Sequence, residues 1–166
     1  MKKLLFAFVA LLTLGSLSAQ DKKPASPPAT MEANIAGATI EINYSQPSVK
    51  GREIYGELVP FDKVWRTGAN KATSFKTDKD ININGKMLKA GEYALYTIPG
   101  EKEWTVIFNT DVGAWGAYKY SEEKDVLRVS ATPEAHDMTE VMTFTPGKNV
   151  IYLDWAETRV PLKIKG

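Results

Sequence analysis

The 166-residue sequence contains no cysteine and only one histidine, His136. Without cysteine there is no disulfide framework, no thiolate zinc site, no cysteine nucleophile and no lipid anchor on an N-terminal cysteine. One histidine excludes a multi-histidine metal centre. A Ser-His-Asp hydrolase would have to use His136, which lies in a polar stretch predicted to connect two strands. We therefore assign no catalytic residue and predict neither a metal nor any other cofactor.

An excess of charge of one sign is also lacking. The chain has 21 basic and 20 acidic residues. Loss of Lys2 and Lys3 with an N-terminal leader would leave 19 basic residues against the same 20 acidic ones. A chain so balanced lacks the basic surface that binds nucleic acid or anionic lipid. Neither is predicted as a partner.

The N-terminus has the pattern of a secretory signal peptide. Lys2 and Lys3 precede an apolar run from Leu4 to Leu14, and residues 15–19 are mostly small. A positively charged start, an apolar core and small residues at the cleavage site, in that order, predict a cleaved leader over residues 1–19. The run of about 11 residues is shorter than the ~20 that a membrane-spanning helix needs. We expect a periplasmic or secreted protein with no transmembrane segment in the mature chain.

Residues 20–30 hold three prolines, lysine and little apolar mass, which is typical of a disordered tether. The rest, residues 31–166, has the length of one ordinary domain. In residues 38–44 the even positions are apolar, the alternation of a half-buried strand. Asn84-Gly85 between two short apolar runs predicts a hairpin with a type I′ turn.

Turn residues every 8–12 positions separate about nine predicted strands and leave no helix beyond a turn at 54–58. The predicted strands are 38–44, 81–83, 86–88, 93–98, 104–108, 126–129, 141–144, 150–155 and 160–164. This spacing predicts an all-β domain, an antiparallel, jelly-roll-like β-sandwich. Asp80-x-Asn82-x-Asn84-Gly85 also copies the start of a calcium loop, but position 12 is Gly91 rather than glutamate, so a hairpin is favoured.

The segment 113–120 concentrates aromatic residues in a connection too long for a tight turn. Trp115, Tyr118 and Tyr120 lie among glycines there. Long ordered loops on a rigid sheet often carry binding sites, and these rings could stack on a sugar or a peptide, with Asn109 and Asp111 nearby to form hydrogen bonds. The alternative is a loop that folds over an open end of the sandwich and plugs it with Trp115.

The segment 64–70, Val-Trp-Arg-Thr-Gly-Ala-Asn, is the second concentrated region. In a strand, Trp65 and Arg66 point to opposite faces, and Gly68 permits a turn or bulge. Arg66 and Arg52 could act together as forked donors to a carboxylate or phosphate. Alternatively, Arg66 binds backbone carbonyls at a corner of a sheet.

Several short motifs resemble those of one known family. They are Tyr44-Ser45-Gln46-Pro47, Lys50-Gly51-Arg52, Gly56-Glu57-Leu58-Val59-Pro60, the run from Trp65 to Asn70, Ala90-Gly91-x-Tyr93, Trp104-x-Val106-Ile107-Phe108-Asn109 and Trp115-Gly116-Ala117-Tyr118. Over residues 31–164 the sequence resembles exported proteins, common in Bacteroidetes-type bacteria, that are catalogued as domain of unknown function 2911. The resemblance implies export and a single β domain, and it implies no activity and no catalytic residues.

The sequence offers arginine and aromatic side chains suited to binding, and no recognisable set of catalytic residues. This combination favours a non-catalytic binding or envelope-associated module. Its ligand would be a glycan, a peptide or another envelope component. The predicted binding residues are Arg52, Arg66, Asn70, Asn109, Trp115 and Tyr118. One alternative is a glycan-directed hydrolase that uses Asp111 with Asp125 or Glu122, since such enzymes need two nearby carboxylates. Another is a structural domain that docks on a partner through an uncovered sheet face.

Overall fold

The computed structural model describes residues 24–166. The predicted leader and the first residues of the predicted tether lie outside this range. The described chain consists of ten strands and one 3₁₀ turn. The strands are β1 (Pro28–Ile35), β2 (Ala38–Ser45), β3 (Thr73–Thr77), β4 (Ile81–Ile83), β5 (Lys86–Leu88), β6 (Gly91–Ile98), β7 (Trp104–Asn109), β8 (Asp125–Ala131), β9 (Glu134–Pro146) and β10 (Val150–Lys165), and the turn η1 is Glu122–Lys124.

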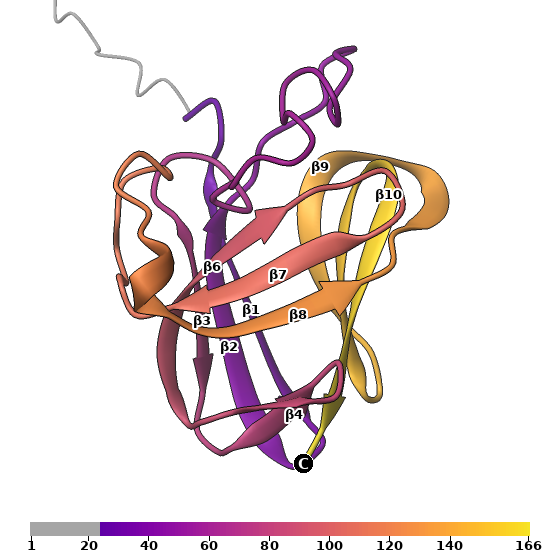
Figure 1. Cartoon of the computed structure of the whole chain (residues 1–166). Coiled ribbons are helices and arrows are strands. Elements are labelled where there is room, and N and C mark those ends of the chain that lie inside the picture. The colour runs from indigo at the N-terminus through magenta and orange to yellow at the C-terminus, as the bar shows by residue number, and fades with distance from the viewer. Residues whose placement is uncertain (1–23) are drawn as a thin grey trace, which may run out of the picture.

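The strands form two antiparallel sheets, which confirms the predicted all-β sandwich. The larger sheet has the order β1-β2-β3-β6-β7-β8, and the smaller has the order β5-β4-β10-β9. Neighbours in the larger sheet follow the chain, except that the β4–β5 hairpin leaves it to pair with β10. Figure 1 shows β6, β7 and β8 crossing the front, with the long β9–β10 hairpin beside them.

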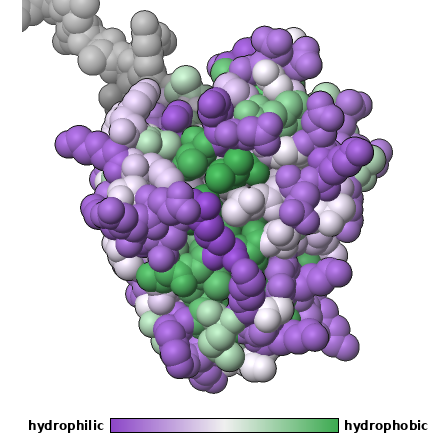
Figure 2. Space-filling model, in the orientation of Figure 1, coloured by the Kyte–Doolittle hydropathy of each residue, from purple (hydrophilic) through white to green (hydrophobic). Residues whose placement is uncertain are grey.

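The inward faces of both sheets form one apolar core. In β2 the even positions from Ala38 to Tyr44 are buried, as the alternation predicts. Val160, Leu162 and Ile164 of β10 are buried as well. A separate small cluster lies on the outer face of the larger sheet, where Ala72, Ala94, Tyr96 and Ile107 pack together. Hydrophobic residues on the surface seen in Figure 2 lie in patches between hydrophilic ones.

The predicted hairpin at Asn84-Gly85 is confirmed. Both residues have positive φ angles, 46° and 94°, and Ile81 pairs with Leu88 across the turn. The Asp80 carboxylate accepts hydrogen bonds from Lys89 Nζ at 2.7 Å and from the Ala90 amide at 2.9 Å. The residues of the calcium-like pattern therefore serve the turn.

Two strands were not predicted from the sequence, and one begins earlier than the expected domain. β1 starts at Pro28 and pairs with β2 from Pro28↔Ser45, inside the stretch expected to be a tether. Proline is tolerated at the start of an edge strand because no ladder N–H is needed there. β3 has only one large apolar residue, Phe75, and its buried Thr73 and Thr77 carry hydroxyl groups.

The C-terminal part also differs from the prediction. The predicted strands 150–155 and 160–164 are one strand, β10, interrupted by an irregularity at Ala156, whose φ is 53°. The predicted polar connection around His136 is wrong, because His136 lies within β9. Residues 134–140 of β9 are largely exposed, so their sequence carries no apolar alternation.

Gly85→Ala is expected to lower the free energy of unfolding by about 1 kcal/mol, because only glycine adopts this φ without cost. A Cβ at Gly85 would meet nothing within 4 Å, so no steric clash contributes. The lost stability therefore measures the cost of the backbone conformation alone. Gly85→Asn is the matched control, since asparagine tolerates positive φ and should lose less. Chemical denaturation measures both, and equal losses would contradict this origin.

Candidate functional site

The segment between β2 and β3 crosses one end of the sandwich and carries most of the site. Figure 1 shows it as loops that project beyond the sheets, at the end opposite the C-terminus. Ile54 and Val59 are buried, and the Val59 amide donates to the Ile54 carbonyl at 2.8 Å. Trp65 and Thr97 exchange backbone hydrogen bonds of 2.7 and 2.9 Å. The loop is therefore tied to β6 on its return path.

Four aromatic rings close the core under this loop. Tyr55 and Trp104 meet edge to face with centroids 5.0 Å apart, and Trp65 stacks on Trp155 at 5.7 Å. The two pairs also touch, with Trp65 and Trp104 6.4 Å apart. We call Tyr55, Trp65, Trp104 and Trp155 the aromatic cluster. Its rings come from the loop, β7 and β10, so the cluster joins both sheets to the loop.

A cleft of about 320 Å³ opens beside Trp65. We call it the arginine cleft, and its walls are Leu58, Val59, Pro60, Lys63, Val64, Trp65, Arg66, Ala117 and Tyr118. The Nε atom of Arg66 is buried, and no hydrogen-bond partner for it lies within residues 24–166. Lys63 adds a second positive charge to the wall. The cleft thus combines apolar walls with an unpaired guanidinium N–H.

The backbone after Arg66 is held in unusual conformations. Thr67 and Asn70 have φ angles of 54° and 60°, in the left-handed region that a β-branched threonine rarely adopts. Glycine is favoured at position 68, since its φ is 157° and a Cβ there would lie 3.1 Å from the Ser45 carbonyl oxygen, a tight contact. Thr67 is fully buried, and its carbonyl accepts from Thr73 Oγ1 at 2.7 Å. Such strain concentrates at sites where a side chain must be positioned.

The segment 113–120, which we call the aromatic loop, lies on the outer face of the larger sheet. Ala117 and Tyr120 pack on the small outer cluster. The Ala72 amide donates to the Ala114 carbonyl, and the Gly116 amide donates to the Asn70 carbonyl. The predicted plug is wrong, because Trp115 is 63% exposed and covers no open end. Small Ala117 and the Tyr120 ring supply the packing, which leaves Trp115 free.

A second cleft, of about 480 Å³, continues from the first. We call it the aromatic shelf, and it is lined by Asp111, Val112, Gly113, Ala114, Trp115, Tyr118 and Lys119. Tyr118 belongs to both clefts and is 86% exposed. The structure therefore brings three of the predicted residues, Arg66, Trp115 and Tyr118, onto one continuous surface.

The other three predicted residues have different places. Arg52 donates from Nε to the Val49 carbonyl at 3.0 Å and from its terminal nitrogen to the Ser48 carbonyl at 2.6 Å. Arg52 lines neither the arginine cleft nor the shelf. In the described structure it is therefore not placed to bind one anion together with Arg66, as was predicted. Asn70 supports the aromatic loop through its backbone, and Asn109 is buried.

Sequence reasoning missed the wall formed by Leu58, Pro60 and Lys63. Leu58 is 44% exposed, which is unusual for a large apolar residue. It lines the same cleft as Arg66 because the segment between β2 and β3 folds back on itself. The one available signal was the apolar, proline-containing stretch at 58–60.

The acidic residues proposed for hydrolysis are engaged in ion pairs. Asp125 accepts from Asn109 Nδ2 and Arg128 Nε, each at 2.7 Å, and from the Tyr120 hydroxyl at 2.6 Å. Burial, followed by the hydrogen bond to Asp125, raises the pKa of Tyr120 to about 12. Asp125 therefore fastens the end of the aromatic loop to β7 and β8.

Asp111 and Glu122, the other two acids proposed for hydrolysis, are also paired. Asp111 lies 3.3 Å from Lys124 Nζ, and Glu122 lies 3.3 Å from Arg128. Within residues 24–166, no three histidine or acidic side chains are grouped so as to hold a metal ion.

Asp125→Ala is expected to lower the free energy of unfolding by about 2–3 kcal/mol, because it leaves three donors without their acceptor. Asp111→Ala is the control, since an exposed pair contributes at most about 1 kcal/mol. Thermal or chemical unfolding distinguishes them. Equal stability of the two variants would contradict a fastening role for Asp125.

No helix in the described part of the chain has the length and hydropathy to cross a membrane. No curated protein and no solved structure matches the sequence. Residues 26–164 match the family described as "Protein of unknown function (DUF2911)". Since the match covers most of the sequence, including both clefts and the strained run from Thr67 to Asn70, the chain belongs to this family.

Proposed function

We propose that this domain is a non-catalytic binding module for acidic glycans. The arginine cleft receives a carboxylate-bearing sugar, and the aromatic shelf carries the neighbouring rings of the chain. The proposal rests on Arg66, which lines the cleft and whose buried Nε has no hydrogen-bond partner in the described part of the chain.

A guanidinium whose Nε has no partner within residues 24–166, in the wall of an apolar cleft, favours an anionic ligand. A buried donor without an acceptor costs free energy, and an anion that accepts from it recovers that cost. The guanidinium fork matches the two oxygens of a carboxylate. Lys63 in the same wall strengthens the local positive field. A sugar carboxylate at Arg66 would place its ring against the apolar side of the cleft.

The exposed rings of the shelf extend the same surface. Trp115 and Tyr118 are exposed although each would bury a large apolar area in a core. Flat rings on an anchored loop offer stacking area for sugar faces at low cost in side-chain entropy. The loop is anchored by Tyr120, Asp125 and Ala117, so the shelf is formed before any ligand arrives.

The alternative of a paired-carboxylate hydrolase finds less support. Each acid proposed for it has a cationic partner, and Asp125 accepts three hydrogen bonds. A catalytic acid requires a carboxyl group that is free to exchange a proton with the glycosidic oxygen. The observed pairing fits a structural role for these acids.

We also propose that the domain acts after export, in the periplasm or outside the cell. This rests on the leader pattern of residues 1–19 and on the tether-like composition that follows it. An envelope location would bring the module to acidic polysaccharides. N-terminal sequencing of the mature protein tests it, and an intact N-terminus on a cytosolic protein would refute export.

Arg66→Gln is expected to weaken binding of an acidic oligosaccharide such as a polygalacturonate fragment about 10- to 100-fold, the cost of one charged hydrogen-bonded contact. Arg52→Gln is the matched control and should bind like the wild type, because Arg52 lies outside both clefts. Isothermal titration calorimetry measures both. Binding of an acidic peptide, but of no glycan, would refute the glycan assignment while leaving the anion site.

Tyr118→Ala is expected to reduce glycan binding about 10-fold, as loss of an aromatic anchor does, while stability changes by less than about 0.5 kcal/mol. Its 86% exposure makes a packing role small. Phe108→Ala is the contrast, since this buried ring should cost about 3–5 kcal/mol. A loss of several kcal/mol in Tyr118→Ala would show that the shelf is packing surface.

A further inference from the structure

A third cleft lies on the other side of the aromatic cluster and has the opposite charge. Its volume is about 210 Å³. We call it the acidic cleft, and its lining is Tyr55, Phe61, Gly100, Glu101, Trp104, Pro133, Glu134, Ala135, Glu157 and Thr158. These residues come from the loop before β3, the turn between β6 and β7 with the start of β7, the turn before β9, and the β9–β10 hairpin. The cleft is thus built at the junction of the two sheets.

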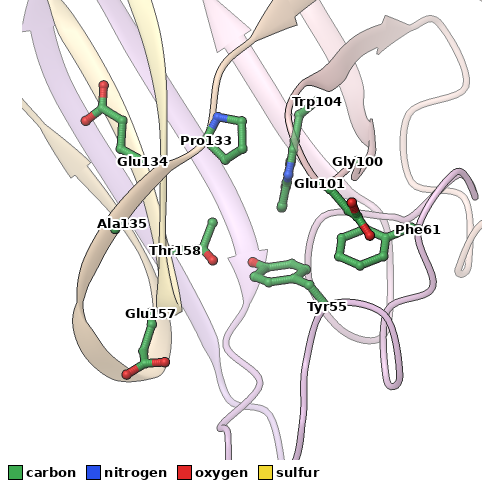
Figure 3. A pocket seen from close by; sticks show the side chains of 10 residues that line it. All are labelled: Tyr55, Phe61, Gly100, Glu101, Trp104, Pro133, Glu134, Ala135, Glu157 and Thr158. Atoms are coloured by element: carbon green, nitrogen blue, oxygen red, sulfur yellow. The ribbon is translucent and has the colours of Figure 1, made fainter.

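The centre of the cleft is aromatic and its rim is acidic. Figure 3 shows the Tyr55, Phe61 and Trp104 rings on one side and Pro133 opposite. Glu101 lies beside Phe61, whereas the carboxylates of Glu134 and Glu157 are turned outward on the far rim. All three glutamates are exposed.

The rim is not neutralised within the described chain. None of the three glutamates has an ion-pair partner in residues 24–166. Arg159 of β10 lies opposite Glu134 of β9 in the strand register. Its guanidinium, however, binds both oxygens of Asp154, at 2.6 and 2.8 Å. Within the described residues the rim is therefore negative, and the nearby Arg159, whose charge also interacts with Glu134, is held by Asp154.

The Tyr55 hydroxyl is the independent observation that points to a ligand. Its oxygen is buried and has no hydrogen-bond partner in residues 24–166. In Figure 3 it is directed across the cleft toward the Thr158 side chain. Burial, reinforced by the charge of Asp154, raises the pKa of Tyr55, so the phenol stays neutral. A buried polar group without a partner costs stability, and native proteins retain few of them.

We propose that the acidic cleft binds a primary alkylammonium group. The ammonium would lie over the aromatic rings, donate to the Tyr55 hydroxyl and be attracted by the glutamate rim. Aromatic faces attract cations. An ammonium group has three N–H donors, and the hydroxyl groups of Tyr55 and Thr158 can accept hydrogen bonds from them. Two sources share this chemistry, a lysine side chain of a partner peptide and a free polyamine. The proposal does not depend on the arginine cleft.

The test uses the full domain and follows backbone amides by NMR. Nα-acetyl-lysine amide is the first probe and spermidine the second, and the amides of Gly100, Ala135 and Thr158 should shift with saturation. Nα-acetyl-norleucine amide lacks the ammonium, and the trimethyllysine analogue keeps the charge but has no N–H donor. Both should bind more weakly than the lysine probe. A lysine source predicts tighter binding when the lysine is placed in a peptide, and a polyamine source predicts that spermidine binds best.

Tyr55→Phe removes only the hydroxyl group. It should weaken the lysine probe about 3- to 10-fold, the worth of one hydrogen bond, while the melting temperature stays equal or rises. Glu101→Gln, Glu134→Gln and Glu157→Gln combined should weaken binding about 3- to 10-fold and remove most of its salt dependence. Glu57→Gln, an exposed acid outside the cleft, is the matched control and should change nothing.

Any of the following results would overturn the proposal. They are norleucine and lysine probes that bind equally, wild-type affinity in Tyr55→Phe, and amide shifts confined to residues outside the acidic cleft. The absence of any saturable shift with both amine probes would overturn it as well.

Discussion

Packing within the aromatic cluster is the interaction on which the functional end of the molecule depends. Trp104 begins β7 in one sheet, Trp155 lies in β10 of the other, and Tyr55 and Trp65 come from the crossing segment. Aromatic pairs at these distances contribute beyond the area they bury. The cluster therefore fixes the crossing segment to both sheets at once. The cluster also supplies part of the wall of each cleft, Trp65 to the arginine cleft and Tyr55 with Trp104 to the acidic cleft.

Local charge in this domain is organised differently from its total charge. The chain as a whole is almost neutral, yet one cleft contains Arg66 and Lys63 and another is rimmed by three glutamates. The aromatic cluster separates the two, with Trp65 facing the first and Tyr55 and Trp104 facing the second. A balanced composition is thus compatible with small sites of either sign, because a few charges gathered in one cleft set the local field there.

The strands that could be predicted are those with strong local signals. β2 alternates apolar and polar residues, and Asn84-Gly85 supplies the only φ angles that a type I′ turn accepts. β3 was missed because threonine fills two of its inward positions. Thr73 and Thr77 are buried through hydrogen bonds to the carbonyls of Thr67 and Lys79, partners that no local pattern reveals.

For the site, the sequence by itself determined the residue types, the positions of the turns between the strands and the absence of cysteine. Alternation and turn preference act over a few residues, so they can be read along the chain. Only the tertiary structure decided that Arg66 shares a cleft with Tyr118, that Arg52 binds its own loop, and that Trp115 stays exposed. These placements depend on how loops dock on the sheets, which is set by packing between residues far apart in sequence.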